Sequence, residues 1–162
     1  MVEINVVGSF DAALENKFNK DLKAVKPNDK LLINITSHGG DVDVLKRMAA
    51  TLLALKNKGV EVITFVPNYA DSAGFFLFLL GDNREIAEKA TVHYHAPRVE
   101  LYSDVYTKND LTSLVEDLTA YQDFTNQIFR ASCDISDELF SLIENSELPM
   151  TRAHLVSLGI IN

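Results

Sequence analysis

Along the chain, segments with apolar residues at the spacing of a β-strand take turns with segments at the spacing of an α-helix. Period-two alternation predicts strands over 2–6 and 90–95, and continuous apolar runs predict strands over 31–35 and 60–66. The continuous runs are typical of strands that are covered on both faces. The polar stretch 84–89 is interpreted as a connection.

Between these strands, apolar residues recur at helical spacing. Each of these segments follows or contains a residue that can cap a helix N-terminus. The predicted helices span 12–25 (capped by Ser9 or Asp11), about 17 residues after Asp41, 72–81, about 110–131 (opened by Thr107 or Asn109), a short segment after Ser136 and a last turn or two after Thr151. Alternating strands and helices predict an α/β fold with a mostly parallel sheet and right-handed βαβ crossovers.

Length and composition narrow the class of protein. The 162 residues fit a single domain, 1–162, and 47% hydrophobic with 23% charged residues is typical of a soluble globular chain. A net charge of −8 repels phosphate backbones, so we expect no nucleic-acid partner. Cys133 is the only cysteine, which excludes an intrachain disulfide and favours a reducing compartment. With no secretory signal and no membrane-spanning run, we expect a cytoplasmic protein without a membrane partner.

Two turns at the carboxyl ends of predicted strands could carry chemistry. The first contains Gly39-Gly40, where free backbone amides could face an anion, although plain turn geometry explains a Gly-Gly pair equally well. The second carries Ser72 ahead of an apolar helix, where the amide of Ala73 could stabilise an oxyanion. The alternative is that Ser72, or Asp71, only caps that helix.

A serine nucleophile needs a base. His93 and His95 share one face of the strand that follows the Ser72 helix, and a neighbouring parallel strand could bring one of them near the serine. The alternatives are a surface pair or a metal pair. A third ligand is not evident, and we expect neither a metal nor an organic cofactor.

Three segments together resemble the ClpP-type peptidases of the ClpP/crotonase superfamily. They are INITSHGGDVDVLKRMAATLLAL, VPNYADSAGFFLFLLGDNREIAEKATVHYHAP and the closing LPMTRAHLVSLGIIN. The long helix near 110–131 resembles the handle helix by which these subunits pair. The resemblance spans nearly the whole chain in the same order.

The resemblance implies a crotonase-type ClpP fold with a protruding handle helix and a serine endopeptidase activity. Carried over by position, Ser72 matches the nucleophile, His95 the general base and Glu147 the third member of the triad. Gly40, with Gly39 beside it, and Ala73 match the amides of the oxyanion hole. Polypeptides are then the expected substrates, and the expected assembly is a homo-oligomeric ring that could stack on a second ring.

This sequence departs from the family pattern at several positions. Glu147 stands where the family has aspartate, His38 where it has proline, and Ala73 where it has methionine. The chain begins almost on its first strand, without the axial-gate segment of members that work with an AAA+ unfoldase, which argues against such a partner. Short ClpP-like proteases, including those of phage capsid assembly, are similar in this respect.

Two other functions remain open at this point. The replaced triad residue also fits a non-catalytic scaffold or assembly subunit. A crotonase-like acyl-CoA enzyme would share the fold and the paired-amide oxyanion hole, but the positions of Ser72 and His95 argue against it.

Overall fold

A parallel sheet forms the centre of the fold in the computed structural model, which describes residues 1–103 and 105–162. Its strands in the described residues are β1 (Val2–Val7), β2 (Lys30–Thr36), β3 (Glu61–Val66) and β5 (Asn83–Ile86), in the order β1-β2-β3-β5. Each neighbouring pair is parallel. The predicted α/β fold with a mostly parallel sheet is confirmed.

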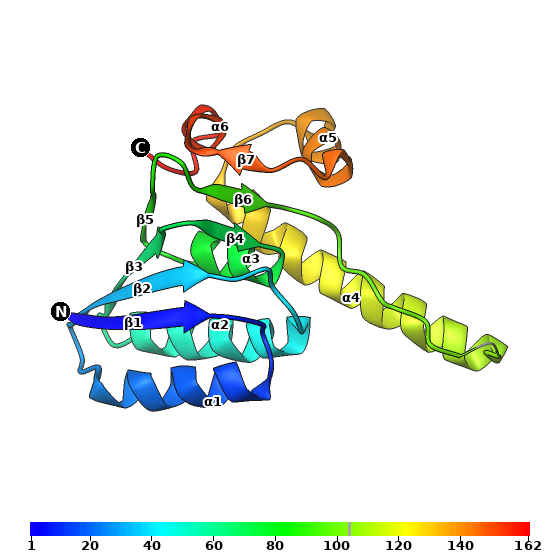
Figure 1. Ribbon diagram of the computed structural model, residues 1–162, viewed down its shortest axis with the longest axis horizontal. Coiled ribbons are helices and arrows are strands. Elements are labelled where there is room, and N and C mark those ends of the chain that lie inside the picture. Colours follow the sequence, from blue (N-terminus) through cyan, green and yellow to red (C-terminus); the bar gives the residue numbers. More distant parts are fainter. Residues whose placement is uncertain (104) are drawn as a thin grey trace.

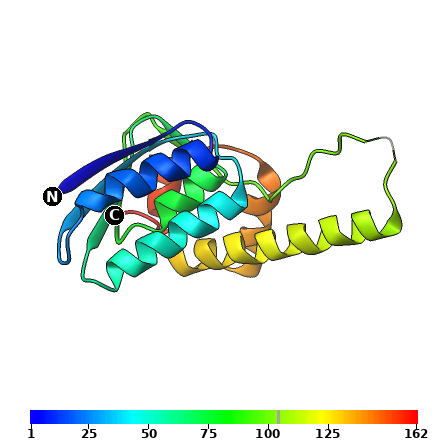
Figure 2. The same ribbon diagram turned by 90° about the horizontal axis from the view of Figure 1, so that it is seen from below.

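Helices α1 (Ala12–Asp21), α2 (Val42–Lys56) and α3 (Ala73–Leu79) lie on one face of this sheet (Figures 1 and 2). Asp11 and Asp41 cap α1 and α2, and a 3₁₀ turn, Leu22–Ala24, follows α1. Because each right-handed crossover moves to the next strand in the same direction, all the connecting helices fall on the same side.

The prediction that two strands are covered on both faces was wrong. Alternate residues of β2 and β3 are buried against the helices, whereas the residues between them, such as Leu32 and Ile63, are only half-buried. The continuous apolar runs therefore do not mean that helices cover both sides of the sheet.

A second, smaller sheet carries much of the candidate site. In the described residues it contains β4 (Tyr69–Asp71), β6 (Thr91–His93) and β7 (Met150–Thr151), with β4 parallel and β7 antiparallel to β6. β4 was not predicted from the sequence, and β5 lies in the stretch that was interpreted as a polar connection. Both are short, and β5 is a polar edge strand held by main-chain pairing, so neither carries a hydrophobic pattern.

The long helix α4 (Lys108–Ser132) starts at a capping box between Thr107 and Asp110, and its N-terminal half projects from the body (Figure 1). Phe129 is fully buried, whereas Leu111 and Val115 are exposed. The apolar face of this predicted helix therefore packs against the core only at its C-terminal end. No described helix combines the length and the apolar character needed to cross a membrane.

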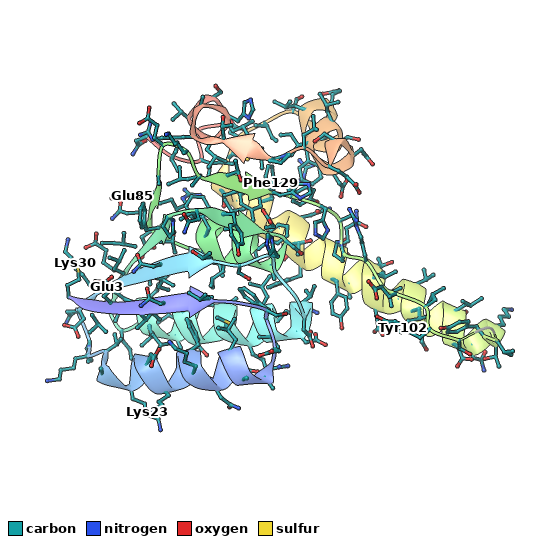
Figure 3. The ribbon with its side chains drawn as sticks, in the orientation of Figure 1. Glu3, Lys23, Lys30, Glu85, Tyr102 and Phe129 are labelled. Carbon is teal, nitrogen blue, oxygen red and sulfur yellow. The ribbon has the colours of Figure 1, made fainter. Side chains whose placement is uncertain are left out.

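The core behind the second sheet is aromatic. Phe129, labelled in Figure 3, lies with its ring centroid 5.4 Å from that of Tyr94 and 6.1 Å from that of Phe75. Phe140, from α5 (Asp137–Ser146), packs on Phe129 at 5.5 Å. This cluster joins α3, β6, α4 and α5. The chain ends with α6 (Arg152–Ser157), after which Ile160 and Ile161 are buried.

Candidate active site

The loop after β2 lies directly against the residues that precede Ser72. The Ser37 amide donates to the Tyr69 carbonyl at 3.3 Å, and the Asp71 amide donates to the Ser37 carbonyl at 2.8 Å. The Ser37 hydroxyl accepts the Gly39 amide at 2.9 Å and donates to the Gly8 carbonyl at 2.6 Å. These bonds bring together the two turns that the sequence analysis singled out.

Gly39 is required by the close approach of the two turns. A β-carbon at this position would lie 2.6 Å from the Ser72 β-carbon and 2.9 Å from the Ala73 nitrogen. Real contacts essentially never come this close, and Gly39 also has a φ of +95°. The Gly39-Gly40 pair is therefore more than a generic turn signal, because the serine packs on it.

Ser72 has an unusual backbone conformation, with φ 53° and ψ −124°. Its amide donates to the His93 carbonyl at 2.8 Å, and within the described residues its hydroxyl makes no hydrogen bond that caps α3. A non-glycine residue in such a region persists only when its surroundings hold it there. Capping therefore does not account for the serine.

The turns also leave backbone amides unpaired. Among the described residues, the amide of Gly40 has no hydrogen-bond acceptor, and the amide of Ala73, at the start of α3, has no intrahelical one. The Gly39 amide, in contrast, is held by the Ser37 hydroxyl. The two free amides flank the place where Gly39 packs on Ser72.

Strand β6 ends at His93, which lies against the Ser72 turn, and His95 follows two residues later. Asp71 pairs with His93 in the β4–β6 ladder, and the His93 and His95 rings lie 5.6 Å apart in an edge-on arrangement. The His95 Nδ1 lies 2.9 Å from the Ala96 carbonyl oxygen. A carbonyl can only accept, so this nitrogen carries the proton and Nε2 of the neutral ring is left as the acceptor. His93 Nε2 is buried and lacks a partner among the described residues.

The Glu147 carboxylate is bonded to Arg98 and not to His95. β7 pairs with β6 through Thr91↔Thr151 and Val92↔Met150. Continued by three residues, this antiparallel register would put Glu147 opposite His95. The ladder stops first: Glu147 ends α5 in a left-handed conformation, φ 50°, and its carboxylate forms an ion pair with Arg98.

A histidine–carboxylate pair that was not predicted from the sequence lies beside the serine. His38 Nδ1 lies 2.7 Å from Asp71 Oδ2, and the His38 ring stacks on Tyr69 at 4.1 Å. The available signal was positional, since His38 precedes Gly39 and Asp71 precedes Ser72, at the ends of strands that meet. This pair adds a side-chain link between the two turns.

The described residues contain no group of three or more His, Cys, Asp or Glu side chains arranged to hold a metal ion. The site consists instead of one strained serine, two free amides and histidines on the adjacent strand. The Clp protease family model matches residues 3–162. The chain belongs to the Clp protease family. No curated protein matches this chain.

Because the family match spans residues 3–162, nearly the whole chain is that of a ClpP-like peptidase. The match covers both turns, β6 with its histidines, the projecting α4 and the closing segment around Glu147. It therefore agrees with the order of segments on which the sequence resemblance rests.

Proposed function

We propose that this Clp protease family member is a serine endopeptidase in which Ser72 is the nucleophile and His95 the general base. Glu147 is the acid that orients His95, and the amides of Gly40 and Ala73 bind the oxyanion. The observation that carries the proposal is the strained Ser72 backbone, at φ 53°, with a hydroxyl that caps nothing in the described residues. Strain of this kind clusters at catalytic sites, and nucleophilic serines sit on such sharp strand-to-helix turns.

The reaction follows from these roles. The Ser72 hydroxyl attacks the peptide carbonyl carbon while His95 Nε2 takes the hydroxyl proton. When the C–N bond breaks, His95 returns that proton to the leaving amine. A water molecule then attacks the acyl-serine with His95 again as base, releasing the carboxylate product and restoring the serine. Each oxyanion donor contributes about 3 kcal/mol to such a transition state.

Gly39 is not one of the proposed oxyanion donors, although the family resemblance placed it beside them. Its amide is bonded to the Ser37 hydroxyl, so the proposed oxyanion donors are Gly40 and Ala73 alone. Gly39 instead permits the close packing of its turn on Ser72 and Ala73.

The activity is tested by incubating the purified protein with an unfolded, fluorescently quenched polypeptide. We expect cleavage by wild type and none by Ser72→Ala or His95→Ala. Ser136→Ala is the matched control, because that hydroxyl only caps α5. Equal cleavage by wild type and Ser72→Ala would contradict the proposal.

We also propose that the chain works as a homo-oligomer. Clp proteases generally form rings that act on polypeptides. The projecting half of α4 exposes Leu111 and Val115, and Tyr102, labelled in Figure 3, is 87% exposed in the segment that leads to this helix. Exposed apolar side chains gathered on one arm are typical of an interaction site. Light scattering should therefore give a mass several times 18.0 kDa, and a monomer at all concentrations would contradict this part.

The ion pair between Glu147 and Arg98 favours a second candidate, a scaffold or assembly subunit without peptidase activity. In that case the carboxylate would serve structure rather than catalysis. The same experiments separate the two: a scaffold subunit assembles but does not cleave polypeptides.

A further inference from the structure

Arg98 lies where it can control the proposed catalytic acid. It follows His95 by three residues and donates to the Glu147 carboxylate. The β6–β7 register, if continued three residues past its last pair, would put Glu147 opposite His95. In this structure the His95 Nδ1–H faces the Ala96 carbonyl instead. The proposed acid and base therefore each have another partner, and Arg98 links the acid to the segment that carries His95.

We propose that Arg98 is a positioning residue that competes with His95 for the Glu147 carboxylate. The proposal rests on the proposed function, since it concerns the acid of that same triad. In one arrangement Glu147 pairs with Arg98 and the His95 Nδ1–H donates to the Ala96 carbonyl, as in this structure. In the other, Glu147 turns to His95 and accepts the Nδ1–H.

The two arrangements differ in what they offer the transition state. Both leave Nε2 as the proton acceptor, because in both the proton is on Nδ1. When His95 takes the serine proton it becomes positively charged, and a carboxylate stabilises this charge better than a neutral carbonyl does. The arrangement with Glu147 on His95 is therefore the faster one.

The competition is balanced closely enough to be measured. The side chains of Arg98 and Glu147 are 56% and 60% exposed, and an exposed ion pair of this kind shifts an equilibrium by no more than about fivefold. Removing Arg98 should therefore raise the fraction of chains with Glu147 on His95 by up to about fivefold.

The experiment measures the rate at which a fluorophosphonate probe labels the full-length protein. We expect Arg98→Ala to raise the rate about two- to fivefold, and Arg98→Lys, which keeps the charge, to stay near wild type. In a Glu147→Gln background Arg98→Ala should change nothing, because there is no carboxylate to release. Arg47→Ala, which removes the ion pair between α2 and Glu15, is the matched control and should label at the wild-type rate.

An unchanged or lower rate in Arg98→Ala would overturn the proposal, as would a rise that persists in the Glu147→Gln background. If that variant does not fold, Glu147→Asn replaces it, since asparagine tolerates the left-handed backbone at this position. Circular dichroism and light scattering confirm that the variants compared share the same fold and mass.

Failure of this inference can be told apart from failure of the proposed function. If no variant is labelled, wild type included, the serine is not an activated nucleophile and the proposed function fails. If wild type is labelled and Ser72→Ala is not, the nucleophile stands, and the Arg98 variants alone decide the inference.

Discussion

The strained backbone of Ser72 makes a prediction about stability that is independent of any substrate. At φ 53° and ψ −124° a residue with a β-carbon is disfavoured, whereas glycine reaches this region freely. Replacing Ser72 by glycine should therefore relieve strain, while replacing it by alanine should retain it. We expect Ser72→Gly to be the more stable of the two variants, although both lack the nucleophile.

The magnitude follows from two opposing terms. A non-glycine residue in a sparsely populated region costs about 1–3 kcal/mol. Glycine in turn loses about 0.5–1 kcal/mol more conformational entropy on folding than alanine does. Taken at the middle of each range, the difference favours Ser72→Gly by roughly 1 kcal/mol, which corresponds to about 2–4 °C in Tm for a chain of this size.

The assay is urea unfolding of both variants at equal protein concentration, because an oligomer's stability depends on concentration. Ser113, an exposed residue within α4, supplies the matched control position. There glycine should be less stable than alanine by about 1 kcal/mol, the opposite sign, since the helix imposes no positive φ.

A Ser72→Gly variant that is equally stable or less stable than Ser72→Ala would refute this reasoning. It would mean that the turn imposes no strain at this residue. The observation that carries the proposed function would then be lost, whatever the enzymatic result.

Three further predictions concern other parts of the molecule. Gly39→Ala should abolish probe labelling, because the added β-carbon would lie 2.6 Å from that of Ser72. Gly159→Ala is the control and should label normally, because among the described residues no atom lies within 4 Å of its added β-carbon. Burial and a nearby carboxylate raise the pKa of Tyr94, so its neutral form stabilises the fold up to a pH of about 10. Above that pH the difference in stability between wild type and Tyr94→Phe should fall. A difference in urea midpoints that stays constant with pH would contradict this. Val115→Glu, on the projecting half of α4, should lower the particle mass in light scattering, while Ser113→Glu on another face should not.

Much of the fold could be predicted from the sequence because its long elements carry strong periodicity. The strands around Ile4, Ile33 and Val62 and the helices capped by Asp11 and Asp41 are all present. Short elements with few apolar residues were missed. β4 has three residues and β5 reads Asn-Arg-Glu-Ile, and neither contains enough apolar positions to show a period.

The candidate site was predictable where it depends on local turns. Gly39, Gly40, Ser72 and Ala73 could be singled out because strand ends and helix starts are visible in the sequence, and the structure brings these turns together. The partners of long side chains could not be predicted in this way. The bond between Arg98 and Glu147 depends on the path of the chain between α5 and β7.

The central claim is that Ser72 is an activated nucleophile, and site-specific labelling tests it most directly. Wild type is incubated with a fluorophosphonate, its intact mass is measured, and the modified residue is located by peptide mapping. We expect one adduct per chain, on Ser72, that is absent from His95→Ala under the same conditions. No adduct while a control serine peptidase is labelled, or an adduct on another serine, would contradict it.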